Sequence, residues 1–350
     1  MWTEEKLDSL LTEPSENLIE DIKIISGDIM VLGAGGKMGP SLSLLAKKAM
    51  DAAGKSSKVI AVSRFSDPFA VKLLKENNVE AVSCELMDET ELSKLPDVEN
   101  IIYMAGRKFG TGGQEYLSWA MNTWLPARIA DKYKNSKIVV FSSGNIYPQF
   151  SVDSGGAVGD AAGNAARGAA ETTTPEPVGE YAMSTLGRER MFEYAAHAFN
   201  TPVAMFRLNY AVDLRYGVLF DIAQNILSDS PVSLGIPYFN CIWQGDANEV
   251  AIRCLVYSDK NVFKLNVTGP ETVSVKDAAI KLGRLLGKEP VFTGKPGETA
   301  LLSDASKMFS LFGHPSVTLD TLIKWQAEWL LDGGRGLGKP THFEERKGQY

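Results

Sequence analysis

Short apolar runs alternate with longer amphipathic stretches from residue 29 onward. The runs are rich in Val and Ile and have the length of buried strands, whereas the stretches between them repeat apolar residues every three or four positions, as helices do. Strands that alternate with helices form parallel sheets covered on both faces. The pattern predicts a doubly wound α/β fold with strands at 29–32, 58–62, 79–83, 101–104 and 137–141, and helices at 41–53, 68–76 and 114–134.

Flanking segments extend this pattern toward both ends of the chain. Two short helices are expected before residue 28, with Thr3 and Ser15 as their N-caps and Pro14 between them. The Ala/Gly-rich segment 154–177 interrupts the alternation and is expected to be a long loop. Beyond it, the pattern predicts strands at 203–208 and 262–267 and helices at 180–200, 275–286 and 319–331.

The composition is that of a globular protein without polyanionic partners. Of the 350 residues, 44% are hydrophobic and 23% charged, and the net charge is −7. An acidic chain without a basic run does not form a nucleic-acid interface, because phosphate contacts need clustered Lys and Arg. Cys84, Cys241 and Cys254 lack disulfide or zinc spacing, and no apolar run is long enough to span a bilayer. We expect a soluble, cytoplasmic protein with no nucleic-acid, membrane or metal partner.

The first predicted strand leads directly into a glycine motif at 31–39, VLGAGGKMG. Glycines at 33, 36 and 39 allow a tight turn, close approach of a pyrophosphate to the backbone, and close packing of helix on strand. The helix that follows presents free N–H groups and a positive dipole end to an anion. The strand–motif–helix order favours dinucleotide binding over a purely structural turn. The expected contacts are Gly33, Gly36, Lys37, Met38 and Gly39.

The end of the second predicted strand bears on the choice of dinucleotide. An NAD site usually has Asp or Glu there to bind the ribose hydroxyls. This chain has Ser63 and Arg64 instead, and a guanidinium suits the 2′-phosphate of NADP. We therefore expect NADP to be favoured, although a merely solvated Arg64 would leave NAD equally open.

At this point the chain resembles the extended short-chain dehydrogenase/reductase family, which includes NAD-dependent sugar epimerases and dehydratases. The resemblance begins with the glycine spacing and covers roughly residues 29–290. Members of this family commonly pair through the helices corresponding to 114–134 and 180–200, so the resemblance implies a homodimer. The other matching segments are 103–106, 140–147, 207–210, 244–247 and 266–275.

Individual site residues are also implied by the resemblance. Ala105 and Gly106 match the family's fourth-strand segment beside the nicotinamide, and Leu86, after the third strand, is a further expected cofactor contact. Asn122 matches an Asn that the family keeps on the following helix. Ser143 falls on the position of the catalytic Ser or Thr.

The catalytic helix departs from the family pattern Tyr-x-x-x-Lys, because Tyr181 is followed by Thr185. In the intact motif the Lys holds the nicotinamide ribose and lowers the pKa of the phenol. A free Tyr has a pKa of about 10 and is a weak base at neutral pH without a nearby cation. Thr185 can bond a ribose hydroxyl but supplies no charge. Four cations are candidate substitutes: Lys37, Arg107, Lys108 and Arg188.

The resemblance implies an NAD(P)-dependent enzyme that transfers a hydride to or from a sugar or a sugar-derived alcohol or ketone. Tyr181 would act as acid and base, Ser143 would hydrogen-bond the substrate, and Arg107, Asn145 and Asn209 would bind it. Epimerisation or dehydration with a recycled cofactor is the alternative, since both begin with the same step. The altered motif also leaves open a redox-silent dinucleotide-binding or regulatory protein.

The expected division of the chain follows from the same comparison. Residues 1–28 form an N-terminal helical extension. Residues 29–205, with a later segment at about 240–268, form an NAD(P)-binding Rossmann domain. Residues 206–239 and 269–350 form a smaller C-terminal α/β lobe, which binds the substrate, and the C-terminal tail.

Overall fold

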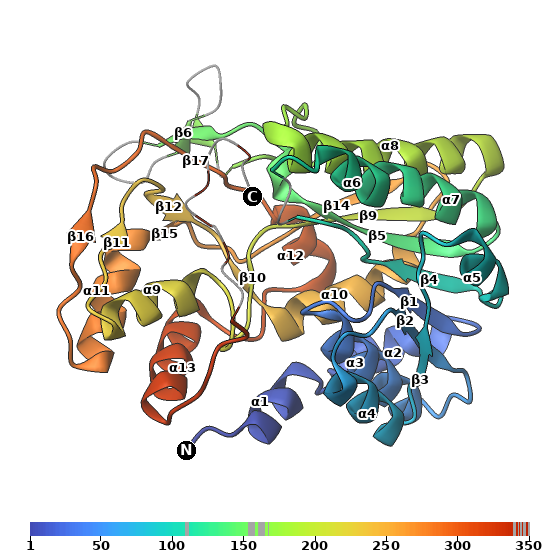
Figure 1. The fold of residues 1–350 in the computed structure, drawn as a ribbon, viewed down its shortest axis with the longest axis horizontal. Helices are drawn as coiled ribbons and strands as arrows, with labels where there is room; N and C mark the ends of the chain where they lie inside the picture. The colour runs from blue at the N-terminus through green and yellow to red at the C-terminus, as the bar shows by residue number, and fades with distance from the viewer. Residues whose placement is uncertain are drawn as a thin grey trace.

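A parallel sheet of seven strands forms the centre of the molecule, in the order β14-β9-β5-β4-β1-β2-β3 (Figure 1). The structure is a computed structural model that describes residues 1–108, 112–152, 158–159, 165–166, 168–338, 341, 343, 345 and 348. This sheet confirms the predicted doubly wound α/β class. The strands are β1 Ile29–Leu32, β2 Val59–Ser63, β3 Glu80–Ser83, β4 Asn100–Tyr103, β5 Lys137–Ser143, β9 Val203–Leu208 and β14 Phe263–Val267.

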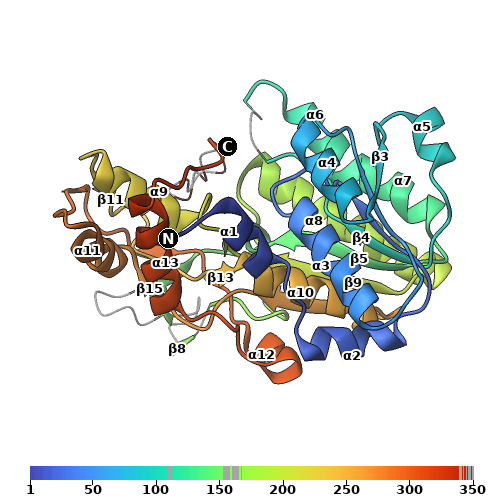
Figure 2. The same ribbon diagram turned by 90° about the horizontal axis from the view of Figure 1, so that it is seen from below.

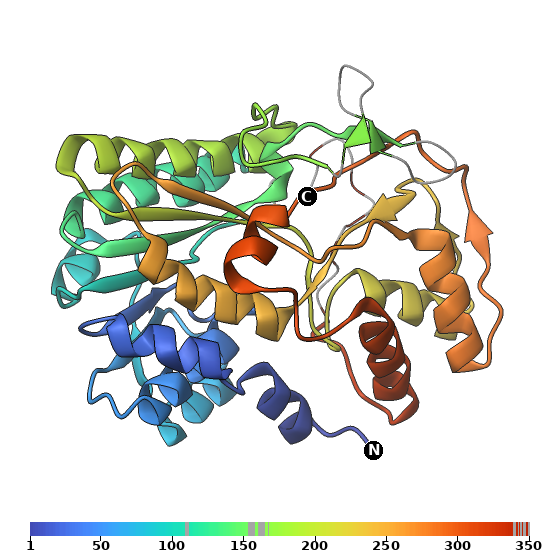
Figure 3. The ribbon, with the colours of Figure 1, turned by 180° about the vertical axis from the view of Figure 1, so that it is seen from behind.

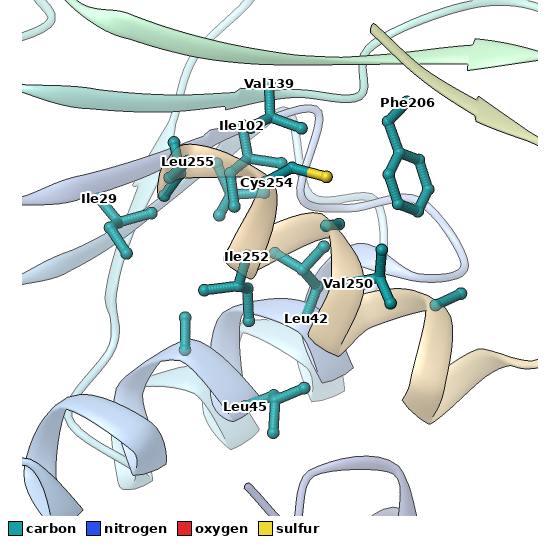
Figure 4. Close-up of a cluster of buried hydrophobic side chains, with 14 of the residues drawn as sticks. Ile29, Leu42, Leu45, Ile102, Val139, Phe206, Val250, Ile252, Cys254 and Leu255 are labelled. Atoms are coloured by element: carbon teal, nitrogen blue, oxygen red, sulfur yellow. The ribbon is translucent and has the colours of Figure 1, made fainter. Parts of the chain in front are cut away.

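Helices cover both faces of the sheet. Because side chains of a strand alternate, Val31 enters one apolar core and Leu32 the other. Figure 4 shows the core on the side of α10, where Ile102, Phe206 and Ile252 pack together. In the described parts of the chain, no helix is long and apolar enough to cross a membrane. One face carries α2 Glu16–Ile24, α3 Gly39–Ala52, α4 Pro68–Glu76, α10 Gln244–Tyr257 and α12 Ser306–Phe312, and the other carries α5 Glu89–Lys94, α7 Leu125–Lys132 and α8 Gly179–Phe199.

A second lobe lies beside the carboxyl ends of the strands (Figures 1 and 3). Its core contains Phe239, Leu282 and Trp329, from segments far apart in the sequence. The division of the chain at residues 205 and 268 stays a prediction. Residues beyond 268, such as Met308 and Phe312, also pack in the core beside the central sheet. The lobe contains α9 Val218–Leu227, α11 Val275–Leu286 and α13 Leu319–Leu331, with short strands β10 Ala211–Val212, β11 Val232–Ser233, β12 Tyr238–Phe239, β13 Ile242–Trp243, β15 Val273–Ser274 and β16 Phe292–Thr293.

The N-terminal helices connect the two lobes. The predicted N-caps are confirmed: Thr3 Oγ1 accepts a hydrogen bond from the backbone of Lys6 at 3.2 Å, and Ser15 Oγ from that of Leu18 at 3.1 Å. Helix α1 Glu4–Leu11 buries Leu7 in the core of the second lobe, whereas α2 packs against α3 and α10, which cover the sheet. Figure 2 shows α1 between α13 and α10. The extension therefore bridges the lobes.

Two sequence-based expectations were wrong. The helix predicted at 114–134 is interrupted by a π-helical turn at Ala120–Trp124, between α6 Glu115–Trp119 and α7. Pro126 explains the interruption, because it has no N–H for the carbonyl four residues earlier. The segment predicted to be a loop, 154–177, contains two short strands. Residues 153–157, 160–164 and 167, around these strands, lie outside the described residues. Strands β6 Phe150–Val152, β7 Val158–Gly159, β8 Ala165–Ala166 and β17 Thr299–Ala300 form a four-stranded sheet.

A buried ion pair joins α8 to the sheet below the carboxyl ends of its strands. Arg207 donates to both carboxylate oxygens of Glu189, at 2.9 and 2.7 Å. Ser142 Oγ donates to the same carboxylate at 2.6 Å, and Arg207 Nη1 donates to the Tyr147 hydroxyl at 2.6 Å. The hydroxyl in turn donates to Asn266 Oδ1 at 2.8 Å. These bonds satisfy the charges inside the protein and fix α8, β5, β9 and β14 relative to one another.

We predict that Arg207→Met lowers the free energy of unfolding by about 3–5 kcal/mol, because it leaves the Glu189 carboxylate buried without its cation. Lys281→Met is the matched control, since its pair with Asp320 lies on the surface and is worth at most about 1 kcal/mol. Urea unfolding followed by circular dichroism measures both. Equal losses in the two variants would contradict the structural role of the buried pair.

Candidate functional site

The three glycines of the predicted motif, Gly33, Gly36 and Gly39, have different environments. Gly33 has φ of +92°, and a Cβ there would lie 2.5 Å from the backbone nitrogen of Ala105. At Gly39, the first residue of α3, a Cβ would lie 2.2 Å from the Ala34 carbonyl oxygen. At Gly36 the nearest atom would be the Gly33 carbonyl oxygen at 3.5 Å. Two glycines therefore shape the turn, and the third leaves an open stretch of backbone.

A cavity of about 630 Å³ lies on this turn at the carboxyl ends of β1 to β4. We call it the glycine-loop cavity. Seven of the residues predicted to bind the cofactor line it, and Lys37, Met38 and Gly39 do not. The predicted lining residues are Gly33, Gly36, Ser63, Arg64, Leu86, Ala105 and Gly106; the sequence analysis missed Gly35, Phe65, Ser66, Cys84, Glu85, Met104 and Met121.

A second cavity, of about 180 Å³, lies at the carboxyl ends of β5 and β9. We call it the Tyr181 cavity. Ser143, at the end of β5, and Tyr181, in the first turn of α8, both line it, as the proposed pairing of the two requires. Two further predicted residues, Asn145 and Asn209, also lie there. The remaining lining residues are Lys37, Met38, Lys108, Ser142, Leu208, Tyr210, Ala211, Tyr216, Gly217, Val218 and Thr341.

Hydrogen bonds to neighbouring protein groups hold the polar side chains of the Tyr181 cavity. Ser143 Oγ donates to Asn145 Oδ1 at 3.1 Å and accepts from the Asn145 backbone at 3.2 Å. Asn209 Nδ2 donates to Asn240 Oδ1 at 2.7 Å, and Asn240 Nδ2 donates to the Ser303 carbonyl at 2.8 Å. The hydroxyl and the two amides are thus oriented before any ligand arrives.

Two of the four candidate cations lie in this cavity. Lys37 Nζ donates to the Ala211 carbonyl at 2.9 Å and lies 4.3 Å from the centre of the Tyr216 ring. Lys108 Nζ lies 5.7 Å from the centre of the Tyr181 ring. Burial lowers the pKa of Lys37 and that of Lys108 to about 8 each. At neutral pH both side chains are therefore still predominantly protonated.

The other two candidate cations are engaged elsewhere. Arg188 is buried and donates to the Phe141 carbonyl at 2.7 Å and to Asn122 Oδ1 at 2.8 Å. Arg107 Nη2 donates to Gln114 Oε1 at 2.8 Å, and Arg107 is not among the residues that line the Tyr181 cavity. The structure thus brings neither guanidinium into the group formed by Ser143 and Tyr181.

Asn122 and Thr185 are fully buried behind the site. Asn122, in the π-helical turn, accepts from the Arg107 backbone N–H and donates to the Arg107 carbonyl, both at 2.8 Å. It therefore fixes the segment that leads from β4 to Lys108. Thr185 Oγ1 has no hydrogen-bond partner and lines neither cavity, so the structure does not bring it to the ligand side of the helix.

A carboxylate that the sequence analysis missed stands beside Arg64. Glu85 Oε2 lies 3.3 Å from Arg64 Nη1, and the Arg64 side chain is 75% exposed. Glu85 follows the end of β3 closely, just as Arg64 follows the end of β2. The rule that ligands bind at the carboxyl ends of parallel strands therefore applies to both residues.

The central sheet and the two cavities at its carboxyl ends define a Rossmann-type α/β protein, and solved structures share this fold. No protein-family model and no curated protein matches the sequence. The UDP-glucuronic acid 4-epimerase from Bacillus cereus in complex with NAD has a TM-score of 0.69 and 18% identity, over 87% of this chain and 96% of that one.

Two further solved structures are similar to the same extent. The UDP-glucose 4-epimerase from Thermotoga maritima with UDP-glucose has a TM-score of 0.68 and 18% identity, over 87% of this chain and 99% of that one. The dTDP-glucose 4,6-dehydratase from Bacillus anthracis in complex with NAD has a TM-score of 0.68 and 18% identity, over 88% and 97%. This similarity confirms the fold that the sequence resemblance implied.

We predict that Gly39→Ala and Gly36→Ala differ in stability. The added Cβ at Gly39 would overlap the backbone of Ala34 and lower the free energy of unfolding by about 1–3 kcal/mol. The Cβ at Gly36 would make only an ordinary van der Waals contact with the Gly33 carbonyl oxygen and change that free energy by less than about 0.5 kcal/mol. Urea unfolding of both variants measures the difference. Equal destabilisation would show that the turn is not built as described.

Proposed function

We propose that the protein is an NAD(P)-dependent enzyme that transfers a hydride to or from a sugar or a sugar-derived alcohol or ketone. The observation that carries the proposal is the meeting of Ser143 and Tyr181 in one cavity beside the glycine turn. A hydroxyl and a phenol in one small cavity suit proton transfer to and from an alcohol or carbonyl oxygen.

The residues of the glycine-loop cavity fit a nicotinamide dinucleotide. The open backbone at Gly36 leaves room for a pyrophosphate at the N-terminal end of α3. The ends of β2 and β3 supply Ser63, Arg64 and Glu85 for the adenosine ribose. Ala105 and Gly106 line the same cavity after β4, on the way to the Tyr181 cavity. When bound, the dinucleotide supplies the hydride acceptor or donor.

The residues of the chain then have distinct roles. Tyr181 gives a proton to, or takes it from, the substrate oxygen, and the Ser143 hydroxyl hydrogen-bonds that oxygen. Lys108 Nζ, 5.7 Å from the centre of the Tyr181 ring, places a positive charge beside this acid–base group. A cation from the segment after β4 thereby stands in for the one that Thr185 lacks.

Two alternative functions stay open, one enzymatic and one not. The solved structures that share the fold include epimerases and a dehydratase, and these reactions would use the same two residues with a recycled cofactor. The burial of Thr185 away from both cavities keeps a redox-silent dinucleotide-binding protein as the candidate from another class. Product analysis together with cofactor absorbance separates the three.

We predict that Tyr181→Phe lowers turnover by about 10²- to 10⁴-fold, because it removes the acid–base group, and leaves NADH and NADPH affinity nearly unchanged. Sugars, sugar acids and nucleotide sugars are the substrates to be screened, with absorbance and product chromatography as readouts. Tyr194→Phe is the matched control, since Tyr194 lies on the same helix and is 63% exposed. Full turnover in Tyr181→Phe would refute the assigned role. Cofactor binding without any turnover in the wild type would support the redox-silent alternative.

The choice between NADP and NAD rests on Arg64. The neighbouring structures with a dinucleotide contain NAD, and Glu85 offsets part of the Arg64 charge. We nevertheless propose that Arg64 takes the 2′-phosphate of NADP, since its exposed guanidinium can turn to a planar pair of hydrogen bonds.

We predict that Arg64→Ala weakens NADPH binding by about tenfold, the loss expected for a charge-assisted hydrogen bond, and hardly changes NADH binding. Glu85→Gln should strengthen NADPH binding, because it frees the guanidinium. Fluorescence titration of the wild type and both variants with NADPH and NADH measures these affinities. Wild-type protein that binds NADH at least as tightly as NADPH, or unchanged NADPH affinity in Arg64→Ala, would contradict the NADP preference.

Pairing of two copies through α6, α7 and α8 stays a prediction. Support comes from exposed apolar side chains on α6, on α8 and on the π-helical turn before α7, namely Tyr116, Trp119, Trp124, Met183 and Tyr194. Exposed aromatic residues that cluster on neighbouring helices are typical of a protein–protein interface.

A further inference from the structure

The Tyr181 cavity is positively charged. It is lined by Lys37 and Lys108, and among its described lining residues there is no Asp or Glu. We infer that the substrate of this site is a small anion, a polyhydroxylated acid or phosphate ester of monosaccharide size, whose negative group is held between Lys37 and Lys108. This inference rests on the proposed function and names the substrate class that it leaves open.

The direct contacts of Lys37 Nζ are with neutral groups. The Ala211 carbonyl and the Tyr216 ring that surround Nζ are both neutral. Asp213, whose carboxylate favours the charged form of Lys37, already accepts from Arg215 at 3.2 and 3.0 Å. An ammonium group that leaves water needs a compensating charge, and a bound anion supplies it.

Lys108 adds to the positive electrostatic potential that Lys37 creates in the Tyr181 cavity. The positive charge of Lys108 lowers the pKa of Lys37, as does that of Arg215, whereas Asp213 opposes them. Two ammonium groups that repel each other across one small cavity are both stabilised when an anion lies between them. The turn after β1 supplies one of these groups and the segment after β4 the other, so the anion would lie at the carboxyl ends of the central strands.

The size and the remaining lining define the rest of the ligand. The cavity holds about 180 Å³, below the ~300–1,000 Å³ of sites for drug-sized ligands, so a sugar nucleotide does not fit inside it. Asn145, Asn209 and Tyr216 offer hydrogen bonds to hydroxyl groups. Burial raises the pKa of Tyr216 to about 12, so its hydroxyl stays a donor. These features favour a chain or ring of hydroxyl groups that ends in an acid.

The test measures ligand binding directly, by isothermal titration calorimetry with and without NADPH. D-Gluconate and D-galacturonate are the carboxylate probes, D-glucose 6-phosphate is the phosphate probe, D-sorbitol and D-glucose are the neutral probes, and UDP-glucose is the nucleotide probe. Lys37→Met and Lys108→Met remove one charge each at nearly constant length. Lys72→Met is the control, because Lys72 is exposed on α4. Lys37→Arg keeps the charge, and thermal unfolding checks that every variant is folded.

We expect at least one acid to bind, the neutral probes to bind at least about tenfold more weakly, and each Met variant to lose about tenfold or more in acid affinity. Lys37→Arg and Lys72→Met should bind nearly as the wild type does. The stronger of the carboxylate and phosphate probes identifies the anionic group.

Several results would overturn the inference. The first is binding of neutral polyols as tight as that of acids, and the second is absence of binding by every acid. The third is tight UDP-glucose binding that survives Lys37→Met. The fourth is a Lys37→Met variant that loses affinity for NADPH but not for the acids. Failure of the proposed function looks different, because the acids would still bind in a lysine-dependent way while no probe is turned over. Turnover of a neutral sugar that is unaffected by Lys37→Met would refute the inference and leave the proposed function standing.

Discussion

The site depends on the close contact between the first turn of the chain and the end of the fourth strand. Gly33, at φ +92°, brings its backbone against Ala105, and a side chain there would separate β1 from the segment after β4. Gly39 brings the start of α3 equally close to Ala34. Both cavities border this contact: the glycine-loop cavity contains Gly33 and Ala105, and the Tyr181 cavity contains Lys37 and Lys108, which follow them in sequence.

The buried pair of Glu189 and Arg207 gives the opposite side of the Tyr181 cavity its rigidity. Ser142, which donates to Glu189, directly precedes Ser143, and α8 carries both Glu189 and Tyr181. The distance between the Ser143 and Tyr181 side chains is therefore set by bonds that lie beneath them rather than by the ligand. Preorganised hydrogen-bond groups of this kind spend no ligand-binding energy on their own ordering.

The positive side chains that line the Tyr181 cavity, Lys37 and Lys108, come from the segments after β1 and β4 and not from α8. Where the resembled family has a lysine on the helix, Thr185 is buried and lines neither cavity, while Lys37 and Lys108 project from the segments after β1 and β4. A lysine on the helix would act on Tyr181 and the ribose, whereas the two lysines of the cavity would, in the proposed function, also act on the substrate. The altered motif and the proposed anionic substrate are thus two consequences of one arrangement.

Local patterns in the sequence predicted most elements well, because the spacing of apolar residues marks a strand or a helix even where its packing partners lie far along the chain. Strand β9, helix α11 and helix α13 have the predicted bounds. Helix α10 was missed, since it is buried on several sides and shows no amphipathic stripe. The short strand β6 was missed as well, because its partner β17 lies far along the chain.

In the candidate site, too, some residues could be predicted from local sequence and others depend on contacts between distant segments. The glycines, Ser143 and Tyr181 could be found from spacing. The neutral surroundings of Lys37 could not, since Ala211 and Tyr216 come from the second lobe. The pairing of Glu85 with Arg64 joins the ends of two strands, and only the sheet brings them together. The engagement of Arg188 with Asn122 likewise depends on how α8 packs against the π-helical turn.

The most direct test of the central claim is a crystal structure of the protein grown with NADPH and, separately, with NAD. The account predicts that the dinucleotide occupies the glycine-loop cavity, with its pyrophosphate at the backbone of Gly36 and its nicotinamide end directed to Ser143 and Tyr181. A dinucleotide bound outside that cavity, or no binding of either at saturating concentration, would contradict it.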